Sequence, residues 1–365
     1  MNRIIKFDNF LNEALGVPTN IIPLAKELFD FIVNGIHPDD DLDGLCEGPL
    51  VMSGSFNIGD MTIKDIVIGF GFAVSRAKRP VELAGMGSHF ERFLGINKKT
   101  KGYYSGTFVK DEVLLSIKFL VPEDVTGQDI INYINKEKEY LIPILAHELK
   151  HFYDKFKNPR VGVKKWTEYT VVAQNSFGAI QPLNDFLFLS YYLHEFENLV
   201  RPTEMAATID MKRVKPEEFK TFFMDTDIYK KLKLAQEFSL DRMKDQLKNY
   251  FAQIIVALLE IGYDPMNLMT IGKEQLIELV LKEFYESLLV WKGKMMEAII
   301  YPRGKHPLRF LGNKERFYDE YLNKISKFGN DYNSFYKSEA KFLNQEAFRM
   351  IKKLARLYEL TDIYK

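Results

Sequence analysis

The residues best suited to chemistry in this chain are His147, Glu148 and His151, which lie in the segment "ILAHELKHF" (144–152). On an α-helix, residues four positions apart lie on one face, about 6 Å apart along the axis, so both imidazoles can reach one metal ion. Zn²⁺ binds imidazole and carboxylate ligands, and a third protein ligand leaves one position for water. Glu148 can then accept a proton as that water attacks a carbonyl carbon. The pattern predicts a zinc site with Glu148 as the general base.

The apolar surroundings of this motif favour a metal site, because a histidine pair and a carboxylate without partners would be costly to bury there. The alternative is that His147 and His151 are hydrogen-bonded core residues. Cys46 is the single cysteine, which excludes intrachain disulfides and cysteine-based zinc clusters. Any metal must therefore be held by histidine and carboxylate side chains, and we expect a reducing, cytoplasmic compartment.

With this motif the chain resembles the zincin metallopeptidases, in which an active-site helix supplies HExxH and an upstream edge strand holds the peptide substrate extended. The resemblance covers residues 105–210 and implies a Zn²⁺ cofactor, hydrolysis of peptide bonds, and a peptide or protein substrate. The strand-like "VLLSIKFLV" (113–121) lies where that edge strand is expected. Lys150 departs from the uncharged residues that zincins usually have at this position, and we expect its amine to reach solvent.

The third zinc ligand is expected further along the chain. The extended motif HExxHxxGxxH of the metzincin branch fails, because Asp154 and Lys157 stand in place of its glycine and its last histidine. The resemblance then implies the gluzincin branch, which takes a glutamate from a later helix. Asp154 could instead orient a ligand histidine by accepting a hydrogen bond from its free ring N–H. An aspartate exposed on the surface is the alternative.

Two glutamates in "YYLHEFENLVRPTEMAATID" (191–210) compete for this ligand position. We favour Glu204, because Pro202 suits the first position of a helix and Ala207 would let that helix lie close to the HELKH helix. Glu197, predicted at the end of the preceding apolar helix, is the alternative. Zincins also use a tyrosine or histidine to stabilise the oxyanion, and the sequence leaves four candidates open. These are His194, Tyr191, Tyr192 and His306.

The elements that must position these residues predict an α+β fold. Helical spacing predicts an N-terminal amphipathic helix and helices over 21–36, 126–157 and 182–200. The N-terminal helix would bury Ile5, Phe10, Leu11 and Leu15. Composition and alternation predict strands over 60–75 and 160–174, and a hairpin or strand pair over 106–124 closed by Pro122. The glycine-rich segment 83–95 is expected to be a loop leading into a short helix.

Beyond residue 210 the pattern becomes helical, with few strand signals and dense charge. We therefore predict two regions: 1–210, a zincin-like metallopeptidase region with a small β-sheet and the HELKH helix at 144–156, and 211–365, a mostly α-helical domain. The helical half would offer a surface for a protein partner or a wall of the substrate cleft.

The charge balance argues against two classes of partner. The chain has 50 basic and 50 acidic residues, which disfavours attachment to nucleic acid or to anionic lipid by bulk electrostatics. No apolar run approaches the length that spans a bilayer, and the N-terminus lacks the uninterrupted apolar core of a secretory signal. We expect a soluble protein.

Two main functions remain open, beside a third class, a zinc hydrolase that acts on something other than a peptide. One is a zinc-dependent peptidase, and the other is a non-enzymatic structural or interaction protein that keeps a structural zinc site. The opening "FDNFLNEA" (7–14) and the overall layout resemble uncharacterised zincin-like proteins of tailed bacteriophages. That resemblance implies a place in the host cytoplasm or in the virion, and it gives weight to the second function.

Overall fold

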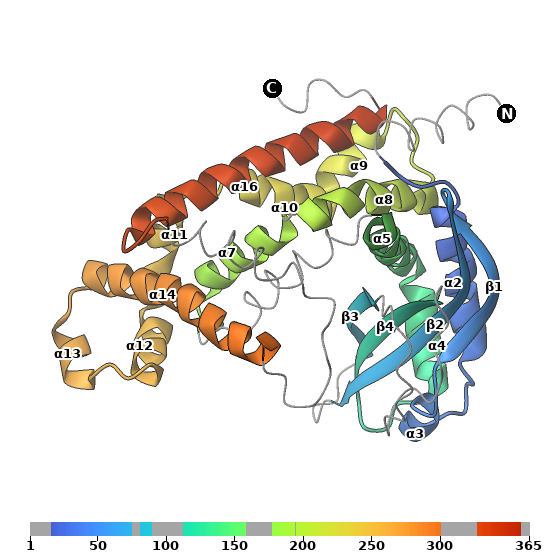
Figure 1. The fold of residues 1–365 in the computed structure, drawn as a ribbon, viewed down its shortest axis with the longest axis horizontal. Coiled ribbons are helices and arrows are strands. Elements are labelled where there is room, and N and C mark those ends of the chain that lie inside the picture. The colour runs from blue at the N-terminus through green and yellow to red at the C-terminus, as the bar shows by residue number, and fades with distance from the viewer. Residues whose placement is uncertain are drawn as a thin grey trace. The chain divides into compact units, whose positions relative to one another are not determined.

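The computed structural model describes residues 16–74, 81–89, 112–157, 177–193, 195–300 and 327–358. They form a mixed α+β structure, in agreement with the predicted fold class (Figure 1). The chain divides into two compact units, Met1–Pro159 with Leu199–Phe219, and Arg160–Asn198 with Lys220–Lys365. These units are interleaved along the chain, whereas the division predicted from the sequence, 1–210 and 211–365, is consecutive.

The first unit contains a mixed sheet, which is four-stranded in the part of the chain that the structure describes. Its strands are β1 (Leu50–Ile58), β2 (Met61–Val74), β3 (Glu82–His89) and β4 (Glu112–Val121). They lie in the order β1-β2-β4-β3, with β2 parallel to β4 and the two outer pairs antiparallel. Among the described strands, β3 is therefore an edge, and it contacts the HELKH helix.

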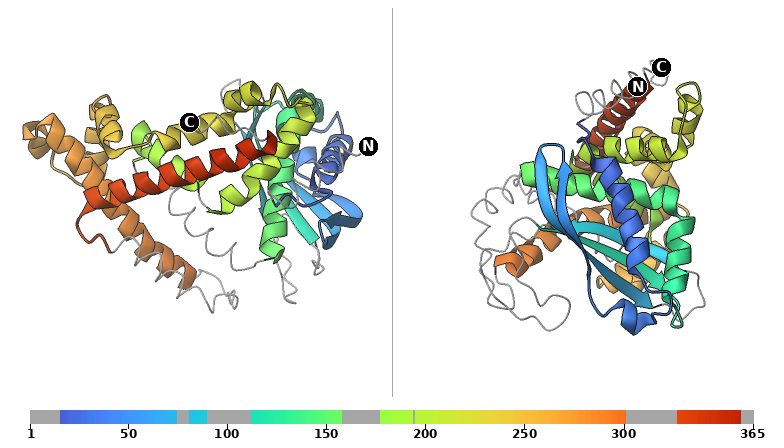
Figure 2. Two further views of the ribbon diagram at one scale, coloured as in Figure 1. Left: turned by 90° about the horizontal axis from the view of Figure 1, so that it is seen from above. Right: turned by 90° about the vertical axis from the view of Figure 1, so that its right-hand side faces the viewer.

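Helices α2 (Ile21–Gly35), α4 (Gly127–Lys136) and α5 (Lys138–Lys157) pack with one another and against this sheet (Figure 2). The Phe119 ring of β4 meets the Tyr133 ring of α4 edge-on, with 6.2 Å between the ring centroids. The Tyr133 hydroxyl accepts a hydrogen bond from the Leu83 backbone N–H of β3 at 2.9 Å. Helix α4 thus contacts both the inner strand β4 and the outer strand β3.

The helices that precede the motif follow the sequence prediction. The helix predicted over 21–36 is confirmed as α2, and the helical region 126–157 is confirmed as α4 and α5 with a break at Glu137. Thr126 and Asp129 form a capping box that starts α4. Helix α5 runs through Pro143 without ending, so the HELKH motif lies inside one continuous helix.

The strand predictions need three corrections. The strand predicted over 60–75 is confirmed as β2, but β1 was not predicted. The segment 113–121, taken for an edge strand, is part of β4 and lies between β2 and β3. The predicted loop at 83–95 is wrong where the structure describes it, because the glycine-rich β3 gains its strand conformation by pairing with β4. Residues 106–111 of the predicted hairpin lie outside the described residues.

The apolar helix predicted over 182–200 is two helices. Helix α7 (Gln181–Tyr192) ends before α8 (Glu195–Lys212) begins. The Asn198 side-chain amide donates a hydrogen bond to the Leu193 carbonyl at 2.8 Å, which satisfies a carbonyl where the first helix stops. Helix α8 therefore starts seven residues before Pro202, the predicted starting point, and Pro202 lies inside it.

The remaining described elements are helical, and those beyond residue 210 agree with the prediction for residues 211–365. They are α3 (Leu42–Leu45), α9 (Phe219–Asp225), α10 (Asp227–Gln236), α11 (Leu240–Leu247), α12 (Phe251–Glu260), α13 (Pro265–Thr270), α14 (Lys273–Ile300), α16 (Tyr332–Ala355) and the 3₁₀ turn η2 (Arg356–Tyr358). The second unit has an aromatic core, in which Phe186 of α7 lies 5.4 Å from Tyr336 and 5.6 Å from Phe238, centroid to centroid.

Some sequence predictions fall outside the described residues. They are the N-terminal helix with Ile5, Phe10, Leu11 and Leu15, and the strand predicted over 160–174. Within the described residues, no helix combines the length and the apolar content that crossing a membrane requires.

Gly127, the first residue of α4, gives a prediction about stability. Its N–H donates to the Asp40 carbonyl at 2.7 Å, and a Cβ added there would lie only 1.9 Å from the His37 carbonyl oxygen. We expect Gly127→Ala to lower the free energy of unfolding by about 1–3 kcal/mol, because the backbone must move apart. Urea denaturation measures the change. Gly48→Ala, where an added Cβ meets nothing within 4 Å, is the control, and equal stabilities of the two variants would contradict the prediction.

Candidate metal centre

The buried polar residues of the described chain are concentrated on two helices, α5 and α8. Every buried polar or charged side chain among the described residues belongs to one of them. These residues are His147, Glu148, Lys150, His151, Glu197, Arg201 and Thr203. Burying a charged group is costly unless it is paired or binds a metal, so this concentration requires an electrostatic explanation.

The HELKH motif lies in a part of α5 that is buried on every side. Residues 145–152 are all buried, with His147 8% and His151 4% exposed. The two imidazole rings lie 4.6 Å apart, centroid to centroid, at an interplanar angle of 81°. The rings therefore face the same region of space, as their spacing on a helix predicts.

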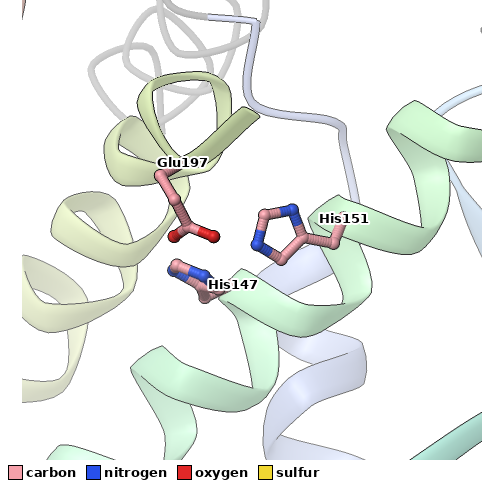
Figure 3. A group of neighbouring side chains, drawn as sticks. All are labelled: His147, His151 and Glu197. Carbon is pink, nitrogen blue, oxygen red and sulfur yellow. The ribbon is translucent and has the colours of Figure 1, made fainter. Parts of the chain in front are cut away.

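A carboxylate completes the group. His147, His151 and Glu197 each offer one ligand atom, and these atoms all lie within 4.8 Å of one another (Figure 3). Glu197 is 3% exposed and lies in the first turn of α8. Two imidazole nitrogens and one carboxylate oxygen are a donor set that zinc accepts, and the three side chains converge as ligands of one ion must. This buried cluster could bind a metal ion.

Glu204, two turns further along α8, contacts the same histidine from another direction. Its Oε2 lies 2.9 Å from Nδ1 of His147 and 2.6 Å from Nη1 of Arg201. An ionised carboxylate only accepts hydrogen bonds, so Nδ1 carries the proton and Nε2 keeps the lone pair that a metal needs. Burial raises the pKa of Glu204, but Arg201 and His147 outweigh it and lower that pKa to about 2.

The geometry thus favours Glu197 over Glu204 as the third ligand, although the sequence favoured Glu204. The sequence prediction had placed the two glutamates on different helices. Because α8 begins at Glu195, both glutamates lie on one continuous helix, and their spacing of seven residues places them within about 20° of each other around its axis. The division between the two units falls within this helix, after Asn198.

Lys150 corrects a second expectation. Its side chain does not reach solvent, because the residue is only 4% exposed and its amine is bonded to Asp154 one turn later. The amine also lies 5.5 Å from the centroid of the Tyr153 ring. Asp154 therefore neutralises Lys150, and no described contact shows it orienting a ligand histidine. Its Oδ2 atom is buried and has no hydrogen-bond partner among the described residues.

The candidates for the remaining catalytic roles are only partly described. Glu148 is 8% exposed and lies about 100° around the helix from His147, which places it at the side of the cluster. Tyr192 is buried at the end of α7. The side chain of Tyr191 and the residues His194 and His306 lie outside the described residues.

Comparisons of the chain with models of protein families, with curated proteins and with solved structures found no match. The chemistry of the site is therefore inferred from these residues alone.

The two glutamates of α8 can be separated by metal affinity. We expect Glu197→Gln to weaken zinc binding more than 100-fold because it removes an anionic ligand. Glu204→Gln should weaken zinc binding only about 10–100-fold, which is typical for a residue that orients a ligand histidine. Competition with a chromogenic chelator measures both values.

Glu139→Gln, an exposed change of equal charge on α5, is the control and should leave the affinity unchanged. A greater loss in Glu204→Gln than in Glu197→Gln would contradict the assignment of Glu197 as the ligand.

Proposed function

We propose that the protein is a zinc-dependent metallopeptidase in which His147, His151 and Glu197 hold the metal and Glu148 is the general base. The convergence of the two HELKH histidines and Glu197 within 4.8 Å is the observation that carries this proposal. It joins a motif suited to metal-assisted hydrolysis to a complete set of three protein ligands. The resemblance of the motif to zincins implies the same activity.

Each residue has a chemical role in this proposal. Zinc, when bound, supplies a polarised water and a Lewis acid for the scissile carbonyl. Glu148 accepts the proton of the attacking water and can pass it to the leaving amine. Glu204 holds His147 in the tautomer that presents Nε2 to the metal.

Strand β3 is the candidate site for an extended peptide substrate. It is an edge of the sheet among the described strands and contacts α5, the helix that carries the motif. An open strand edge can bind a peptide through backbone hydrogen bonds. In this proposal β3 takes the role that was predicted for residues 113–121, since that segment is central in the sheet.

The non-enzymatic alternative is favoured by one observation, the depth of the site. The three ligands and Glu148 are between 3% and 8% exposed, whereas a catalytic zinc must keep one position open for water. A structural metal would join α5 to α8 without this requirement. The two functions agree on metal binding and differ on hydrolysis, so they are separated by activity.

The variant Glu148→Gln tests the role of the general base. We expect it to reduce peptide hydrolysis by a factor of about 10²–10⁴, because an amide cannot accept the proton, while it keeps the zinc content and the folded structure. Cleavage of a mixed peptide library followed by mass spectrometry measures activity, and metal analysis of the same sample measures zinc.

Glu139→Gln should cleave as the natural protein does. If the zinc-loaded natural protein cleaves no peptide in the library or in unfolded protein substrates, the structural alternative holds. Undiminished cleavage by Glu148→Gln would remove that residue from the mechanism.

A further inference from the structure

We infer that Arg201 selects which glutamate of α8 binds the metal: it holds Glu204 on His147 and so leaves Glu197 as the ligand. This inference rests on the proposed metal site and adds a residue that is neither a ligand nor a base. It starts from the arrangement of three charged residues along one helix.

Glu197, Arg201 and Glu204 lie at spacings of four and three residues, so they share one face of α8, one turn apart. Two carboxylates on this face lie close to the same histidine pair: Glu197 has an oxygen near both rings, and Glu204 is bonded to one of them. Either carboxylate is chemically suited to bind the metal. The helix alone does not determine which of them does so, and a further contact must.

Arg201 makes that contact. Its Nη1 lies 2.6 Å from the Glu204 Oε2 atom, which is the same oxygen that lies 2.9 Å from Nδ1 of His147. Arg201 is 7% exposed, and a guanidinium remains charged when buried, so it requires a close anion. Glu204 is that anion. Its carboxylate is therefore held by two donors, the Arg201 guanidinium and Nδ1–H of His147.

Removing the guanidinium would free Glu204 in two ways. The carboxylate would lose its strongest partner, and His147 would lose a fixed acceptor at Nδ1. A bound divalent cation would then be the best available partner for Glu204, which would compete with Glu197 or substitute for it. The contribution of Glu197 to metal affinity should therefore depend on whether Arg201 is present.

A double-mutant cycle on zinc affinity tests this dependence. The variants are Arg201→Met, which keeps the length of the side chain without its charge, Glu197→Gln, and their combination. We expect Arg201→Met to weaken binding about 10–100-fold. Glu197→Gln weakens zinc binding by some factor in the natural protein. In the Arg201→Met background that factor should be at least about 10-fold smaller, because Glu204 takes over as a ligand. Affinity is measured by chelator competition, and hydrolysis is not needed.

Three controls make the outcome decisive. Arg201→Lys keeps a cation, so in that background Glu197→Gln should weaken zinc binding as much as it does in the natural protein. Arg201→Lys also provides the comparison if Arg201→Met does not fold. Arg349→Met removes an arginine of α16 that forms an ion pair with Glu346, three residues earlier in the chain. It should change neither the zinc affinity nor the loss of zinc affinity that Glu197→Gln causes. Folding of each variant is checked by circular dichroism.

If Glu197→Gln weakens zinc binding equally with and without Arg201, the inference is overturned, and Arg201 contributes only to packing. That result leaves the proposed function intact, since the natural protein still binds zinc through Glu197. If the natural protein binds no zinc, the proposed function and this inference both fail.

Discussion

The structure of the site depends on one constraint, which is that a group of charged side chains on α5 and α8 is removed from water. Every buried polar residue of the described chain belongs to these two helices. Such burial is tolerated when each charge has a partner, and two such pairs are described: Asp154 with Lys150, and Glu204 with Arg201. Glu197 lies beside the histidine pair, and these three side chains could bind a metal ion.

The same constraint explains the departures from a simple zincin-like pattern. A lysine inside the motif would be expected to avoid the interior, yet Lys150 is buried because Asp154, one turn later, meets its charge. A second glutamate near the site would compete as a ligand, yet Arg201 and His147 both bind the carboxylate of Glu204. The two ion pairs thus stabilise Lys150 and Arg201 in the interior of the site.

The sequence predicted the local features of this arrangement and missed those that depend on distant contacts. The HELKH motif, its helix and the convergence of its histidines follow from residue type and helical spacing. The choice between Glu197 and Glu204 does not, because it depends on contacts between α8 and α5 that the sequence does not reveal, and an interior proline at Pro202 resembles a helix start. Strand β3 was missed because its glycine-rich sequence is typical of a loop, and its strand conformation depends on pairing with β4.

The central claim is that His147, His151 and Glu197 bind one divalent metal ion. Crystals of the zinc-loaded protein, measured on either side of the zinc absorption edge, test it most directly. We expect one anomalous peak within bonding distance, about 2.0–2.2 Å, of a nitrogen of each histidine and of a Glu197 oxygen. The absence of a peak there, or a peak bound to Glu204 in place of Glu197, would contradict this account.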